Sequence, residues 1–418
     1  MESNLERSAR AREAIRKIKA IDGQVLAHRF GLVGIEGEKY YLAHLVLQGG
    51  GTLGVALLGF IRGLEIANIR FAGLAGTSAG SIVALLIAAA RGRSVGCDTA
   101  LRLVPILQAM PAAAFMDAPY RSRCLIKAAL SKSRAGMLEL VPSLIASIRT
   151  IIKRFGMCRG ARFEDWLGEQ LSRQFQLDTI GDLDTLVRAF HKNLSASVPA
   201  GCSLPSPIDL LHFAAMAMPV GVRIVFPRQM DLFASKYMQR SPAIMARASM
   251  SIPVFFEPKE LELRRATWER HVRGVLAGAY PSEFVDRATK LSTLEFIDGG
   301  MLSNFPIDAF QPLPPSPSQA VPTIGVALTS TPEEPRKQAR PGSLRAFVHH
   351  AITALNSMRH MRDTDALLRA RHVAAAGGKT HVAFVDTGDH NWLNFNMSAE
   401  QVEDLYVKGL CTCAEFLS

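Results

Sequence analysis

Residues 42–80 read LAHLVLQGGGTLGVALLGFIRGLEIANIRFAGLAGTSAG, and this stretch decides the predicted fold. Two mostly apolar runs, Leu42–Leu47 and Ile69–Ala75, each stop at a glycine-rich turn, as buried parallel strands do. Apolar residues at helical spacing follow each turn, over residues 53–67 and 81–90. This βαβα pattern predicts an α/β fold with a parallel sheet and right-handed crossovers.

The second turn, Gly76-Thr77-Ser78-Ala79-Gly80, matches the pattern G-x-S-x-G. Between a strand and a helix, such a tight turn projects the serine hydroxyl above the edge of the sheet. Its small residues let the backbone turn sharply, and the helix N-terminus behind it favours developing negative charge. We therefore predict that Ser78 is a nucleophile.

The first turn contains Gly49, Gly50, Gly51 and Gly54 and also fits the dinucleotide-binding pattern G-x-G-x-x-G. That function needs an acidic residue at the end of the next strand, and the run over residues 69–75 has none. A glycine turn with N–H groups at a helix start also suits an oxyanion hole. We therefore predict that these glycines bind the substrate at an oxyanion hole.

A third motif, Asp298-Gly-Gly300, follows the predicted strand Leu294–Ile297. We expect this strand to be parallel to the others, which puts Asp298 at the same sheet edge as the glycine turns, where ligands of open α/β sheets bind. Asp298 is then the candidate general base. The alternative is a Ser–His–Asp triad, because His381 and His390 follow Asp298 in the order found in α/β-hydrolases.

Together, these three motifs resemble those of the patatin-like phospholipase family, bacterial type. The stretch Ala248–Pro253 resembles the family's small-residue helix end, and Asn304-Phe-Pro306 resembles the residues after its aspartate. The resemblance implies a three-layer α/β/α sandwich with a central, mostly parallel sheet. It also implies a catalytic domain over residues 41–310, after a basic N-terminal extension (1–40) and before a strand and helix region (311–418) that packs on the core.

The resemblance further implies a serine acyl hydrolase, most simply a phospholipase A, that cleaves fatty-acyl esters of membrane lipids. Ser78 would attack the ester carbonyl, Asp298 would take its proton, and N–H groups around Gly50 and Gly51 would hold the oxyanion. No cofactor or metal is implied. The alternative from another functional class is a catalytically silent lipid- or partner-binding protein on the same fold.

The net charge of +11 over 418 residues is concentrated in one place. Residues 121–162 hold ten Lys and Arg against a single acid, Glu139, and alternate with apolar residues. A basic helical insertion of this kind is typical of docking on an anionic membrane surface, although a core-packed helix with a solvated outer face has the same pattern. Nucleic-acid binding is not expected, because no known module is present.

The expected location is the cytoplasm, with peripheral contact to a membrane. The N-terminus lacks the basic start and apolar core of a signal peptide, and the apolar runs are about half a bilayer span. The sequence gives no basis for an oligomeric state. Among the other elements we expect are helices over residues 99–110, 124–132, 138–155, 163–175, 344–368 and 398–416 and strands over 222–226, 254–256, 323–328 and 381–385.

Overall fold

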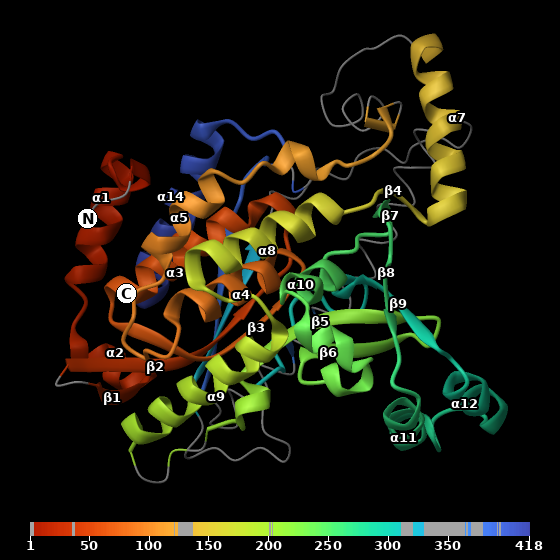
Figure 1. Cartoon of the computed structure of the whole chain (residues 1–418). Coiled ribbons are helices and arrows are strands. Elements are labelled where there is room, and N and C mark those ends of the chain that lie inside the picture. The colour runs from red at the N-terminus through yellow and green to blue at the C-terminus, as the bar shows by residue number, and fades with distance from the viewer. Residues whose placement is uncertain are drawn as a thin grey trace.

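The computed structural model describes residues 4–35, 38–120, 122–123, 137–199, 202, 204–310, 321–329, 364, 367–368, 379–390, 392 and 394–418. The predicted helices at 124–132 and, almost entirely, at 344–368 lie outside these residues, as does most of the basic stretch before residue 137. Figure 1 shows the described elements, with a central sheet covered by helices.

The central sheet contains nine strands in the described part of the chain. Five form a parallel core in the order β11-β10-β2-β3-β5, and four antiparallel strands extend it. The parallel strands are β2 (Glu38–Leu47), β3 (Ile69–Thr77), β5 (Leu211–Met218), β10 (Thr323–Thr329) and β11 (Thr380–Asp386). The antiparallel strands are β1 (Gly31–Ile35), β6 (Val222–Pro227), β8 (Lys259–Glu262) and β9 (Thr293–Asp298).

Both faces of the parallel strands are covered, which explains their continuous apolar runs. On one face, α3 (Gly54–Ile66) and α4 (Ala79–Arg91) follow the two glycine turns and pack with strand residues in the main core. On the other face, Val46 and Ala75 pack on Phe305 and Ile307 in a second apolar cluster. The predicted α/β sandwich and its βαβα start are therefore confirmed.

The direction predicted for the strand before Asp298 is wrong. β9 pairs antiparallel with β5, so it is not one of the parallel strands. β6 occupies one side of β5 along residues 212–217, which leaves β3 and β9 to share the other side. Strand β3 pairs with the first half of β5 and β9 with the second half, so the two strands run toward each other and meet end to end.

The N-terminal and C-terminal segments pack on α3, which covers one face of the sheet. Helix α1 (Ala9–Lys19) buries Ala11, Ala14 and Ile18 and contacts both α3 and the last helix, α14 (Ala399–Leu417). Helix α14 lies so close to α3 that a Cβ atom on Gly59 would reach the Tyr406 carbonyl. The apolar face of α1 is therefore occupied by protein.

The remaining helices surround this core, and one of them stands away from it. Helix α7 projects from the body of the molecule, with the short parallel pair of β4 (Gly156–Cys158) and β7 (Val254–Phe256) at its base (Figure 1). The other helices are α2 (Gly23–Arg29), α5 (Ala100–Gln108), α7 (Met137–Arg154), α8 (Ala161–Phe175), α9 (Ile180–Ser197), α10 (Ala243–Ser249), α11 (Arg265–Leu276) and α12 (Ser282–Thr289). Within the described residues, every helix is too short or too polar to cross a membrane.

Candidate active site

Ser78 lies in a strained turn between β3 and α4. Its backbone has φ 52° and ψ −121°, a region that a residue with a side chain rarely adopts. The turn is so tight that a Cβ atom on Gly76 would lie 2.3 Å from the Gly80 carbonyl carbon, and one on Gly80 would lie 2.3 Å from the Leu47 oxygen. Both glycines of the G-x-S-x-G pattern are thus required by the backbone geometry. Strain of this kind persists where the surrounding structure holds it, often at functional sites.

Ser249, which lies outside the three motifs, holds Ser78 in place. The Ser78 N–H donates to Ser249 Oγ at 2.9 Å, and Ser249 Oγ donates to the Ala214 carbonyl at 2.6 Å. Ser249 is the last residue of α10 and is fully buried. The signal for it was the small-residue helix end at 248–253, which carried no assigned role.

Asp298 lies near Ser78 because β3 and β9 end against each other. Thr77 pairs with Ala214, and Asp298 pairs with the next residue, Ala215, on the same side of β5. A Cβ atom on Gly299 would lie 3.1 Å from Thr77 Cγ2, so the two strand ends are in contact. Both Ser78 and Asp298 are buried.

Hydrogen bonds orient the Asp298 residue from both sides. Its N–H donates to the Ser251 carbonyl at 2.8 Å, two residues beyond Ser249. Its Oδ1 atom accepts from the Gly300 N–H at 2.7 Å. The segment Ser249–Ser251 therefore bonds to both predicted catalytic residues and fixes one relative to the other.

The glycine loop lies beside Ser78 and presents two N–H groups that have no acceptor among the described residues. A Cβ atom on Gly49 would lie 3.2 Å from Ser78 Cβ, and the Gly49 N–H donates to the Asn304 carbonyl. The N–H of Gly54 donates to the Gly51 carbonyl. Within the described chain, no acceptor is found for the N–H groups of Gly50 and Gly51. These two donors are available to a bound anion.

The C-terminal region supports the glycine loop. The Trp392 carbonyl accepts from both the N–H and the Oγ1 of Thr52, at 2.9 and 3.1 Å. Gly51 has φ 55°, and a Cβ atom there would lie 2.2 Å from the Trp392 oxygen. The side chain of Asn304 adds a bond to the Gly49 carbonyl at 2.9 Å. Trp392 had no signal in the sequence, because the contact joins segments 340 residues apart.

Neither histidine of the alternative triad bonds to Ser78 in the described residues. His381 lies near the start of β11, opposite Ile324 and against the Phe30 ring, so it is on the outer strand and away from the edge where Ser78 lies. The Nε2 atom of His390 is 2.9 Å from Asp404 Oδ2, in the C-terminal helix.

A buried arginine connects this site to the base of α7. Arg247 donates to Ser251 Oγ, to the Arg159 carbonyl and to the Glu257 carbonyl. Its guanidinium takes the space that a Cβ atom on Gly160 would occupy, since such an atom would lie 2.3 Å from Arg247 Nε. Burial lowers the pKa of Arg247 from its ordinary value. Sequence reasoning missed it, because a lone arginine in a helix resembles a surface residue.

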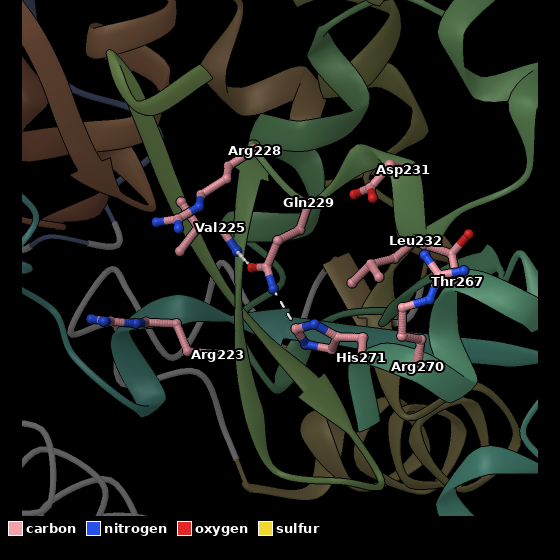
Figure 2. A pocket seen from close by; sticks show the side chains of 9 residues that line it. All are labelled: Arg223, Val225, Arg228, Gln229, Asp231, Leu232, Thr267, Arg270 and His271. Atoms are coloured by element: carbon pink, nitrogen blue, oxygen red, sulfur yellow. Dashed lines mark hydrogen bonds between the residues drawn. The ribbon is translucent and has the colours of Figure 1, made fainter. Parts of the chain in front are cut away.

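A separate cavity of about 490 Å³ lies between β6 and α11 and includes none of the predicted site residues. Figure 2 shows Arg223 and Arg228 on one side of it and Arg270 on the other. Arg223 pairs with Asp308 at 3.6 Å and Arg228 with Asp209 at 3.2 Å. Because the guanidinium groups do not converge and two are neutralised, this cavity is not an evident anion site.

Comparison with known proteins identifies the family of this chain. The family model for patatin-like phospholipase matches residues 45–310. The chain is 24% identical over 357 residues to the uncharacterized protein YqhO of Bacillus subtilis (strain 168), covering 85% of this chain and 91% of that protein. A solved structure, VipD from Legionella pneumophila, aligns with a TM-score of 0.37 and 16% identity over 93% of this chain and 70% of its own. The family match spans more than half of the sequence, and the chain therefore belongs to the patatin-like phospholipase family.

Proposed function

We propose that this protein is a serine acyl hydrolase, of the phospholipase A type, that uses Ser78 and Asp298 as a catalytic dyad. The observation that supports the proposal is the end-to-end meeting of β3 and β9, where Ser78 and Asp298 lie near N–H groups of Gly50 and Gly51 that have no acceptor among the described residues. Family membership supports hydrolysis of lipid acyl esters at the general level.

The first half of the reaction transfers the acyl group to the enzyme. Ser78 Oγ attacks the ester carbonyl carbon while its proton passes to the Asp298 carboxylate. The N–H groups of Gly50 and Gly51 donate to the oxyanion, and Gly49 and Gly54 shape the loop that holds them. Collapse of the tetrahedral intermediate breaks the ester C–O bond, and the protonated Asp298 returns the proton to the leaving alcohol.

The second half releases the fatty acid. Asp298 takes a proton from water, and the water oxygen attacks the acyl carbon of the Ser78 ester. The same two glycine donors hold the second oxyanion. Its collapse restores the Ser78 hydroxyl with the proton from Asp298. One residue thus acts as base and then acid in each half, so the reaction needs no histidine.

The substrate would be reached at an anionic membrane surface, with the protein bound peripherally. Support comes from the basic stretch 121–162, whose described part includes Arg149, Lys153, Arg159 and Arg162 at exposed positions. Attraction to an anionic surface contributes roughly 1 kcal/mol per Lys or Arg close to it.

Substitution of the dyad tests this function and has the largest effect that we expect. Ser78→Ala and Asp298→Asn should each lower the rate of phosphatidylglycerol hydrolysis by about 10⁴-fold. The rate is measured as the release of fatty acid. The control, His390→Gln, should retain activity, since no step passes through that residue. Full activity of the Asp298→Asn protein would contradict the dyad, and loss of activity in the His390→Gln protein would favour the triad.

A further inference from the structure

The end of α7 and the strand pair at its base expose a group of large apolar side chains. Ile148, Ile152, Phe155 and Val254 are 43%, 72%, 63% and 49% exposed. The first three lie four and three residues apart, which places them on one face of the helix and its final turn. Gly156 pairs with Val254, so Phe155 and Val254 lie on adjacent strand ends. We name these four residues the docking tip.

Two of the four residues hold their side chains outward through a strained backbone. Phe155 has φ 58° and Val254 has φ 72°. Left-handed backbone is costly for any residue with a side chain and most costly for β-branched or bulky ones. Glycine or asparagine would adopt both conformations at less cost. Strained and exposed apolar groups weaken the free protein, so their presence points to a bound state that uses them.

The charges around the docking tip identify the kind of partner. Residues 146–162 contain five cations, Arg149, Lys153, Arg154, Arg159 and Arg162, and no acid. Among the described residues, only Arg154 of these five has an ion pair, at 3.2 Å from Glu257. Exposed apolar groups with cations nearby along the chain fit the interface of an anionic bilayer, where the apolar part enters the acyl boundary and the cations meet the phosphates.

The docking tip is also joined to the candidate site by a short stretch of chain. Val254 lies three residues after Ser251, whose carbonyl accepts from the Asp298 N–H, a reach of at most about 10 Å. Phe255 stacks on Phe395 at 5.3 Å between ring centroids, in the C-terminal segment that supports the glycine loop. Insertion at the docking tip would therefore hold the site close to the membrane surface.

We infer that the docking tip inserts into anionic lipid bilayers and that it, rather than the basic charge alone, anchors the enzyme. This inference rests on the proposed function for its biological use, but it concerns binding and can be tested without hydrolysis. Figure 1 shows that α7 projects clear of the helices that cover the sheet, as such an anchor must.

The test is co-sedimentation of the full-length Ser78→Ala protein with phosphatidylcholine vesicles that contain or lack phosphatidylglycerol. Vesicles with phosphatidylglycerol should bind the protein more tightly. Ile152→Ser and Phe155→Asn should each weaken that binding about tenfold, the loss expected for one large apolar side chain. Asparagine suits the left-handed backbone of Phe155, so the fold should be retained. The matched control is Val275→Ser, which removes an apolar side chain of similar exposure (52%) from α11 and should bind normally.

The cations are tested separately. Arg149→Gln and Lys153→Gln should each lower binding to the phosphatidylglycerol vesicles by about fivefold and leave binding to pure phosphatidylcholine unchanged. Unaltered binding by the Ile152→Ser, Phe155→Asn double variant would overturn the inference. A lack of vesicle binding would also overturn the inference. Gel filtration would then show whether Phe155 instead mediates contact between copies of this chain.

The two proposals fail in different ways. If the inference about the docking tip is correct but the dyad is not, vesicle binding depends on Ile152 and Phe155. The protein without substitutions then hydrolyses no ester. If the dyad is correct but the docking tip is not, a short-chain ester dissolved in water is cleaved and vesicle binding is insensitive to both substitutions.

Discussion

Ser78 in the candidate site and Val254 in the docking tip share a left-handed backbone, but their surroundings are opposite. Ser78 is buried, and Ser249, the two flanking glycines and the end of β9 hold it. Val254 is half exposed, and among the described residues only Arg154 of the five cations at 146–162 has an ion pair. The comparison suggests two uses of strain: in one place it orients the serine that we propose as the nucleophile, and in the other it presents an apolar group outward.

Arg247 physically joins these two regions. It bonds to Ser251 beside Asp298 and to the carbonyls of Arg159 and Glu257, which follow β4 and β7. The two regions are consequently parts of one hydrogen-bonded unit. Substitutions in one region alone test whether the two regions differ. Substitution of Arg247 tests how they are connected.

The largest of these further effects is expected at Gly51 in the candidate site. Gly51→Ala should lower kcat by about 10² to 10³-fold with little change in KM, because the oxyanion donor acts mainly in the transition state. The reason is geometric, since the new Cβ atom would lie 2.2 Å from the Trp392 oxygen at φ 55°. Steady-state kinetics on a short-chain ester measures the effect.

Gly221→Ala is the control for that experiment. Gly221 has φ 71° but no atom within 4 Å of a new Cβ atom, so it carries the same backbone cost without the collision. Its kcat should remain close to that of the unaltered protein. If both variants lose kcat equally, the glycine loop has no special part in the reaction.

The next effect is expected at Arg247, the connection between the regions. Arg247→Lys should lower the free energy of unfolding by about 2 kcal/mol, because a single ammonium cannot reproduce the planar set of buried bonds. Urea denaturation measures it. Arg188→Lys, on an exposed ion pair in α9, should change stability by less than about 0.5 kcal/mol and serves as the control. Equal stability of the two variants would mean that the connection is unimportant.

Acid should affect the sheet and not the docking tip, because β2 and β5 contain two neutral histidines, the buried His44 and the partly buried His212. Burial lowers the pKa of His44 to about 3 and of His212 to about 4, and both rings lie against Phe310. The unfolded chain binds these protons below about pH 6.5, so stability should fall as the pH drops through that value toward the folded pKa.

At about pH 5, this difference should cost roughly 2 kcal/mol for each histidine. His44→Leu should remove about half of the two-histidine contribution to the pH dependence, as measured by urea unfolding at neutral and mildly acidic pH. Vesicle binding by the docking tip involves Arg and Lys and should not weaken over the same range. An identical pH dependence in the variant and the unaltered protein would contradict this assignment.

The smallest effect should come from relief of strain in the docking tip. Val254→Gly should raise the free energy of unfolding by about 1 kcal/mol, because glycine accepts φ 72°. Val275→Gly, at similar exposure but within α11, should lower it by about the same amount. Calorimetry distinguishes the two signs. A loss of stability at Val254 would show that its backbone is not strained.

The sequence was sufficient to predict the parallel start of the sheet and the placement of Ser78 after β3. Both follow from local patterns: apolar runs, glycine turns and helical spacing. The direction of β9 could not be obtained in this way. It depends on β5, whose Leu-His-Phe-Ala-Ala-Met-Ala-Met sequence is rich in helix formers and became a strand only through its neighbours on both sides.

The supporting residues of the site were also beyond the sequence. Ser249, Arg247 and Trp392 act through contacts between segments that are distant along the chain, and only Ser249 lies in a stretch with a family resemblance, which gave it no role. The left-handed backbone of Phe155 and Val254 could not be predicted either, because both residue types disfavour it. The basic composition of residues 121–162 indicated a surface role. The exposed apolar side chains of the docking tip could be recognised only from the fold.

The central claim is that Ser78 is a nucleophile whose oxyanion is held by the glycine loop. Intact-protein mass spectrometry after exposure to a fluorophosphonate ester tests it most directly, since the reagent forms a stable phosphonyl ester with an activated serine. We predict one adduct on the unaltered protein, none on Ser78→Ala, and a much slower reaction with Gly51→Ala. An adduct that persists on the Ser78→Ala protein, or its absence from the unaltered protein, would contradict the account.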